Sequence, residues 1–171
     1  TERNSGGEGI PAVVVDEEVY SLLPALLIAT VDKFAQMPWK GETQMLFGRV
    51  DSYCPRHGYG STERPCGEFH RAAGGLPATR TVEAGPLRPP DLIIQDELHL
   101  ISGPLGTLVG LYETAVDRLC EWEAHGRRIR PKLVASTATI RRAGDQVFQL
   151  YVRDVNVFPP PGLDARDNFF A

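Results

Sequence analysis

The sequence contains no apolar run that approaches the roughly 20 residues needed to cross a lipid bilayer. Residues 1–9 are polar and glycine-rich, so they lack the apolar centre of a secretory signal peptide. Only three cysteines occur in 171 residues, and an odd number with this spacing is unlike a disulfide framework. These absences exclude an obvious membrane or secreted class, and we expect a cytoplasmic protein with no membrane partner.

A general positive charge is also absent. The formal net charge is −4, so no overall basic field would attract nucleic acid, and any surface that binds it must be local. The hydrophobic content of 42% and the charged content of 23% are those of a globular protein rather than a disordered one. A chain of this length is about one domain and can bury a core of its own.

Both ends of the chain differ in composition from its centre. Residues 1–15 predict a flexible lead-in, and three successive prolines at 159–161 predict an exit linker over 159–171. The chain starts at a threonine and ends on two phenylalanines before Ala171, so we expect a fragment of a larger protein. Asp16 resembles a helix N-cap, and the short helix that follows should stop at Pro24.

Three short apolar runs predict buried strands of a parallel sheet, at 25–30, 92–95 and 132–135. Weaker strand patterns occur at 46–50 and 152–158. An apolar stripe from Leu105 to Leu119 predicts an amphipathic helix that Gly126 ends, and a second helix is expected over roughly 143–151. Alternating strands and helices of this kind predict an α/β fold.

Polar residues follow directly on the second of these runs. Asp96, Glu97 and His99 come after 92–95, and in parallel sheets ligands bind at the carboxyl ends of the strands. We therefore regard the three side chains as a candidate ligand site. The competing interpretation is a strand that simply leaves the core through polar residues.

Residues 52–90 are rich in glycine, proline, arginine and serine, and they predict an irregular insertion rather than core. Within them the pattern is C-x2-H, eight residues, then C-x3-H. Two thiolates and two imidazoles satisfy tetrahedral zinc, and a bound ion would replace a hydrophobic core that the segment lacks. The candidate ligands are Cys54, His57, Cys66 and His70. Ordinary loop cysteines and histidines are the alternative.

Taken in order, three motifs resemble those of superfamily 2 helicases. Residues 96–99 spell DELH and are similar to the DExH form of the Walker B box. Residues 136–139 resemble motif III, and residues 28–34 resemble motif Ib. More narrowly, 92–106 and 158–164 resemble large bacterial helicase-like proteins of DISARM anti-phage systems.

The resemblance implies a mainly parallel, P-loop NTPase-type RecA-like sheet flanked by helices, with 16–158 forming part of the first RecA-like domain. It implies that Asp96 holds the Mg²⁺ of ATP and that Glu97 polarises the attacking water. His99 and motif III would couple the nucleotide to nucleic acid, and motif Ib would contact its backbone. The motif III residues are Ser136, Thr137 and Thr139, and those of motif Ib are Thr30, Asp32 and Lys33.

The sequence departs from the family in one respect, because no G-x-x-x-x-G-K-[ST] phosphate-binding run occurs in it. The domain is therefore expected to be incomplete on its N-terminal side, with a second RecA-like domain missing as well. We expect the 171 residues alone to be inactive and the full-length protein to use ATP with Mg²⁺. Its expected partners are nucleic acid, with DNA favoured over RNA, and other subunits of the defence system.

Two other classes of function fit the same residues. Asp96, Glu97 and His99 could ligate a catalytic metal in a nuclease or hydrolase, which would need no ATP. A zinc-stabilised module that binds nucleic acid or protein would use the carboxylates only structurally.

Overall fold

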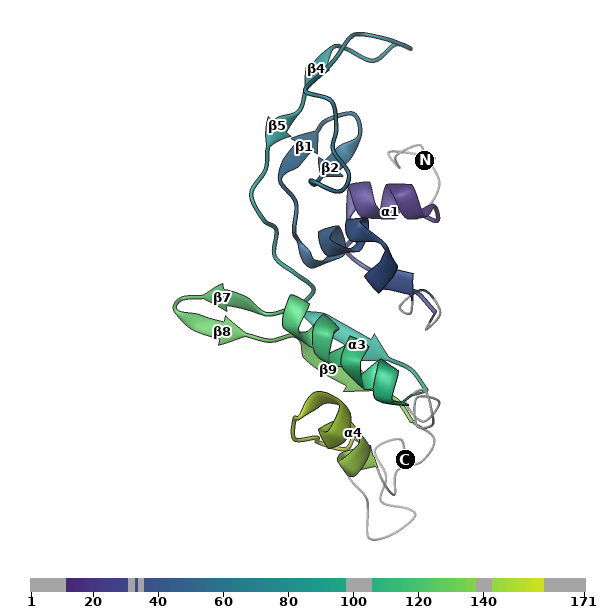
Figure 1. Ribbon diagram of the computed structural model, residues 1–171, viewed down its shortest axis with the longest axis vertical. Coiled ribbons are helices and arrows are strands. Elements are labelled where there is room, and N and C mark those ends of the chain that lie inside the picture. Colours follow the sequence, from purple (N-terminus) through teal and green to yellow (C-terminus); the bar gives the residue numbers. More distant parts are fainter. Residues whose placement is uncertain (1–11, 31–32, 34–35, 98–105, 138–142, 159–171) are drawn as a thin grey trace, which may run out of the picture. The chain divides into compact units, whose positions relative to one another are not determined.

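The computed structural model describes residues 12–30, 33, 36–97, 106–137 and 143–158 (Figure 1). The chain divides into two compact units. The first comprises Thr1–Asp91 and Leu119–Pro131, and the second comprises Leu92–Arg118 and Lys132–Ala171. The predictions for residues 1–11 and for the linker at 159–171 lie outside the described residues. None of the helices in the described ranges is long and apolar enough to cross a membrane.

The first unit begins with helix α1 (Asp16–Leu22), which confirms the predicted short helix. Three acids occupy its first turn, where the partial positive charge of the helix stabilises them. The helix ends at Leu23, whose backbone is left-handed, directly before Pro24. One detail differs from the prediction, because Val15 is the N-cap residue and Asp16 is already helical.

The core of the first unit lies partly in residues 52–90, which the sequence predicted to be irregular, and partly in the residues just before them. Two 3-10 helices, η1 (Met37–Trp39) and η2 (Gly41–Phe47), precede five short strands. Met45, Phe47, Val50 and Cys54 are buried there. The strands are β1 (Ser52–Cys54), β2 (Gly58–Gly60), β3 (Phe69–His70), β4 (Thr79–Arg80) and β5 (Val82–Glu83).

The five strands form two antiparallel sheets, one in the order β2-β1-β5 and one that pairs β3 with β4. Residues 52–90 are therefore not wholly irregular, and part of the unit's core belongs to them. Strands of two or three residues carry almost no periodicity, which explains why the sequence did not indicate them.

Gly58 is required where the turn after β1 meets helix α1. Its φ of 86° is left-handed, and a Cβ on it would lie 2.3 Å from the Ser21 carbonyl oxygen. We expect Gly58→Ala to lower the free energy of unfolding by about 1–2 kcal/mol through the backbone alone, and further through the clash. Gly74→Ala is the matched control, because Gly74 has a φ of 58° and no neighbour within 4 Å. Equal losses for the two variants in urea unfolding would contradict the role of the close approach.

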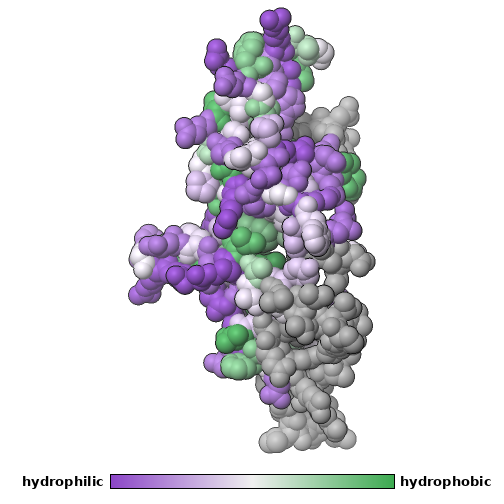
Figure 2. Space-filling view, viewed as in Figure 1, coloured by the Kyte–Doolittle hydropathy of each residue, from purple (hydrophilic) through white to green (hydrophobic). Residues whose placement is uncertain are grey.

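A β-hairpin replaces the end of the helix predicted to run as far as Gly126. Helix α3 (Gly106–Leu119) ends seven residues earlier, and β7 (Trp122–Ala124) then pairs with β8 (Arg127–Ile129). His125 and Gly126 both have positive φ, at 51° and 70°, as the two-residue turn of a hairpin requires. Figure 2 shows the hairpin mostly in purple, in keeping with its arginine and glutamate side chains.

The second unit contains the parallel pair that the sequence predicted. Strand β6 (Leu92–Gln95) pairs in parallel with β9 (Lys132–Ala135), with Gln95 opposite Ala135, and both predicted strands are confirmed. Helices α3 and α4 (Ala143–Tyr151) belong to the same unit. The prediction of full burial is wrong on one face, where Leu92 and Ile94 are 50% and 67% exposed. A larger parallel sheet stays a prediction.

Three other strand predictions are wrong. Residues 25–30 form no strand, and Leu26 and Ile28 are 73% and 86% exposed. Residues 46–50 contain the end of η2 and a left-handed turn at Gly48, and 152–158 contain no strand either. The physical reason is shared: a strand depends on hydrogen bonds from a neighbour, and no described segment pairs with these runs.

Candidate functional site

The β1–β2 hairpin places the first two candidate metal ligands. Cys54 ends β1 and lies opposite Gly58, which starts β2, so His57 sits in the turn between them. The left-handed backbone of Gly58 closes this turn within four residues. The turn folds the C-x2-H segment back on itself, so the side chains of Cys54 and His57 lie on the same small loop.

The β3–β4 pair places the other two ligands. His70 belongs to β3 and pairs with Thr79, and Cys66 precedes that strand by three residues. Side-chain hydrogen bonds from Thr81 and Arg56 hold the chain on both sides of β3. The Thr81 hydroxyl donates to the Gly67 carbonyl at 2.6 Å, and the Arg56 guanidinium donates to the Arg71 and Pro77 carbonyls at 3.1 and 2.8 Å.

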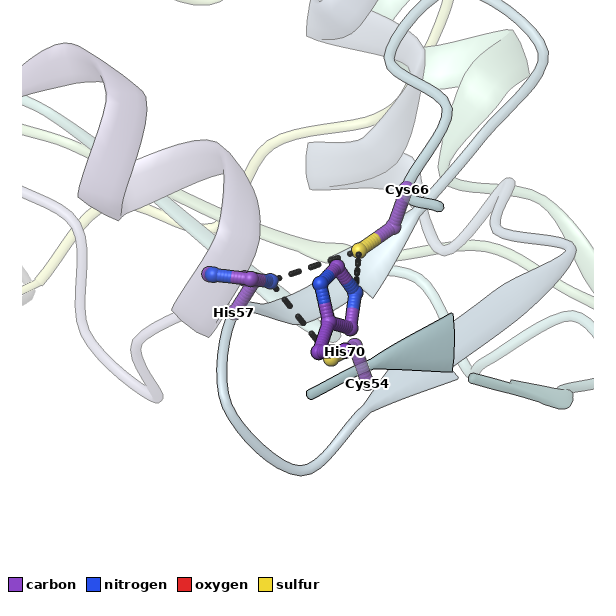
Figure 3. A group of neighbouring side chains, drawn as sticks. All are labelled: Cys54, His57, Cys66 and His70. Carbon is purple, nitrogen blue, oxygen red and sulfur yellow. Dashed lines mark hydrogen bonds between the residues drawn. The ribbon is translucent and has the colours of Figure 1, made fainter. Parts of the chain in front are cut away.

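The four side chains converge as a ligand set for one ion would (Figure 3). Cys66 Sγ lies 3.4 Å from His57 Nδ1 and 3.2 Å from His70 Nε2, and Cys54 Sγ lies 3.5 Å from His57 Nδ1. All four ligand atoms lie within 4.8 Å of one another. Sulfur and nitrogen ligands of a tetrahedral zinc ion are about 3.6 Å apart, so the cluster fits a metal ion such as zinc.

The protonation of the cluster also suits metal binding. Burial opposes ionisation of the Cys54 thiol, but the backbone amides of Arg56 and His57 donate to its sulfur, and its pKa lies below the usual value. Partial desolvation, together with the charges of His70 and Arg56, lowers the pKa of His57. Metal ligation needs a thiolate and a neutral imidazole, and both shifts favour those forms.

The carboxyl ends of β6 and β9 form the second candidate site, which we call the acidic corner and define as Asp96, Glu97 and Ser136. The Ser136 hydroxyl donates to Asp96 Oδ1. The Glu97 amide donates to Asp96 Oδ1 at 3.0 Å and approaches Ser136 Oγ at 3.4 Å. The predicted convergence of the acidic run with the start of 136–139 is therefore present in the structure.

The backbone turns sharply at the acidic corner, because Glu97 has a φ of 54°. A left-handed conformation costs a non-glycine residue about 1 kcal/mol or more, and such strain is concentrated at functional sites. Thr137 follows Ser136 and is half-buried. His99 and Thr139 lie outside the described residues.

The predicted motif Ib residues belong to the first unit, whereas the acidic corner belongs to the second. Lys33 forms an ion pair with Asp16 at 2.8 Å, and Lys40 approaches the same carboxylate at 3.1 Å. Hydrogen bonds from the two lysines lower the pKa of Asp16. Thr30 is exposed, and Asp32 lies outside the described residues. Contact of these residues with nucleic acid stays a prediction.

Sequence reasoning missed one group of residues beside the acidic corner. Gln95, Glu113 and Tyr151 come from β6, α3 and α4, and their side chains are linked by hydrogen bonds. The available signal was weak: a glutamine ending an apolar strand, and a glutamate on the apolar side of an amphipathic helix.

No family model matches the chain. The chain is similar to a DISARM protein. It is 46% identical over 163 residues to the DISARM protein DrmA of Bacillus paralicheniformis, which covers 95% of this chain. The match covers 14% of DrmA, so the chain spans about one seventh of that protein's length.

The similarity to DrmA supports a DISARM-related origin for the chain and agrees with the narrower resemblance of residues 92–106 and 158–164. It extends over nearly the whole chain, and therefore over both the cysteine–histidine cluster and the acidic corner. Membership of the helicase superfamily stays a prediction.

Proposed function

We propose that the chain is part of an ATP-dependent nucleic-acid helicase or translocase, with a RecA-like sheet of which β6 and β9 are two strands. The observation that carries the proposal is the acidic corner: two parallel strands bring the Asp96 carboxylate onto the Ser136 hydroxyl. These positions are the ones that resemble the DExH box and motif III. Ligands bind at such strand ends in open α/β sheets.

The chemistry of the two acids follows from the turn between them. Asp96 is tied to Ser136 and to the Glu97 amide, so its carboxylate is fixed at the strand end, where it would hold the Mg²⁺ of MgATP. The left-handed backbone at Glu97 makes the second side chain diverge from the first. Glu97 would then orient and polarise the water that attacks the terminal phosphate.

We further propose that the protein acts in anti-phage defence, because the chain is similar to a DISARM protein over 95% of its length. The substrate would be DNA rather than RNA, and the partners would be other subunits of the defence system. Lys33 and Thr30 would contact the nucleic-acid backbone, which requires Lys33 to exchange its ion pair with Asp16 for a phosphate.

A second role is favoured by a separate observation, the convergence of four ligand atoms within 4.8 Å. We propose that Cys54, His57, Cys66 and His70 hold a structural zinc ion. Four protein ligands leave no open position for a substrate, so the ion would stabilise the short strands around it rather than take part in a reaction.

The proposed motor and the competing nuclease are separated by one pair of assays on the full-length protein. We expect ATP hydrolysis that depends on Mg²⁺ and is stimulated by DNA, and no cleavage of DNA by metal ions alone. Cleavage without nucleotide would contradict the proposal and favour a metallohydrolase. Residues 1–171 alone should show no ATP hydrolysis above background, since they contain no phosphate-binding loop.

A further inference from the structure

Gln95 links the acidic corner to a partly buried polar cluster that it forms with Glu113 and Tyr151. It is the last residue of β6 and immediately precedes Asp96. Its side-chain amide nitrogen donates to Glu113 Oε1 at 3.1 Å, and the Tyr151 hydroxyl donates to its amide oxygen. Through this one side chain, strand β6 is attached to helices α3 and α4.

The chemistry of the three side chains selects glutamine at this position. An ionised glutamate only accepts hydrogen bonds, and a tyrosine hydroxyl beside it donates. An amide supplies the donor that Glu113 needs and the acceptor that Tyr151 needs. An aliphatic side chain would remove one hydrogen bond from each partner, and a carboxylate would place a second negative charge beside Glu113.

Burial makes these hydrogen bonds important to the folded state. Tyr151 is 5% exposed. Burial raises the pKa of Glu113, whereas the hydrogen bonds that Glu113 forms with Tyr151 and Gln95 act to lower it. Burial, and then the charge of Glu113, also raise the pKa of the Tyr151 hydroxyl. Polar groups in such surroundings depend strongly on their protein partners, because water does not replace them.

The backbone of Gln95 is held by the residue that follows β9. Its carbonyl oxygen accepts a hydrogen bond from the Ser136 amide at 2.9 Å, and the Ser136 hydroxyl donates to Asp96. The last residue of β6 is thus fixed by β9 through its backbone and by α3 and α4 through its side chain. The left-handed turn at Glu97 begins two residues later.

We propose that Gln95 is a positioning residue for the acidic corner, which holds Asp96 and Glu97 in their orientation through its hydrogen bonds to Glu113 and Tyr151. The inference rests on the proposed ATPase function for its catalytic consequence. Its structural part, that the amide bonds fix the end of β6, is independent of that function. A shift of α4 would reach Asp96 through Tyr151 and Gln95.

The test uses the full-length protein with two readouts, steady-state ATP hydrolysis and hydrogen exchange of the peptide that spans 92–97. Gln95→Met, which preserves length and removes both hydrogen bonds, is expected to lower kcat by about tenfold while KM for ATP changes less than about threefold. Exchange at 92–97 should become at least about tenfold faster. Glu113→Leu should act in the same way.

Two variants serve as matched controls. Glu113→Gln retains an acceptor oxygen for both partners, so kcat and exchange should stay within about twofold of the parent protein. Thr114→Val removes the exposed hydroxyl next to Glu113 on α3, which donates to the Gly110 carbonyl at 2.8 Å, and leaves the bonds of Gln95 in place. It should leave kcat and the exchange of 92–97 within about twofold of the parent protein.

The inference is overturned if Gln95→Met and Glu113→Leu leave both readouts within about twofold, or if Thr114→Val lowers kcat as much as they do. Should Gln95→Met fail to fold, the comparison of Glu113→Leu with Glu113→Gln decides the same question. A parent protein without ATP hydrolysis refutes the proposed function, and the exchange readout still decides whether Gln95 fixes the strand end.

Discussion

Replacing Cys66 by serine is expected to abolish zinc binding and to loosen the segment from β1 to β5. Cys66 is central to the cluster, because its sulfur approaches both His57 and His70. A serine oxygen is a much poorer zinc ligand than a thiolate. The affinity for zinc should therefore fall by more than the roughly 10–100-fold that is lost when a hydrogen-bond partner of a metal ligand is removed. Purified parent protein should hold about one zinc ion per chain, measured by elemental analysis, and the variant almost none.

The structural consequence should be local. The strands around the cluster have two or three residues each, and strands of this length are not stable without a further constraint. Chelation or Cys66→Ser should therefore raise proteolysis and hydrogen exchange over 52–83, whereas the peptide at 92–97 in the second unit should be unaffected.

The chain offers controls of matched chemistry. Cys120 is a buried cysteine of the same unit, and His125 lies in the β7–β8 turn, and neither belongs to the cluster. Cys120→Ala and His125→Ala should retain full zinc content. Parent protein that takes up no zinc under reducing conditions, or Cys66→Ser protein that keeps it, would contradict the metal site.

The parts of the structure that could be predicted from the sequence are those with a local signal. The cysteine–histidine spacing indicated the cluster because four residues of suitable chemistry within 17 positions require little from the rest of the fold. The strands at 92–95 and 132–135 were found because an apolar run bounded by prolines or charges is itself a strand pattern. Their parallel pairing followed from the helix between them.

The rest could not be predicted, because it depends on partners distant in sequence. The apolar run at 25–30 looks like a strand, but a strand exists only where another one pairs with it, and the described residues provide none. Gln95 has no local feature that marks it, since its partners lie 18 and 56 positions away. The β7–β8 hairpin depends on left-handed backbone at His125, a residue without the usual turn signature.

Replacing Glu97 by glutamine should have the largest effect on activity. The amide has nearly the same size but cannot polarise a water molecule, so we expect kcat for ATP hydrolysis in the full-length protein to fall about a hundredfold or more. Binding of MgATP should change little, because the proposed metal contact belongs to Asp96. The measurements are steady-state hydrolysis and the affinity for a nucleotide in the presence of Mg²⁺.

Glu123→Gln is the matched control, since it makes the same chemical change on β7, outside the acidic corner, and should leave kcat unaltered. If Glu97→Gln left hydrolysis and unwinding intact, the two acids would be structural, and a zinc-stabilised binding module would explain the chain better.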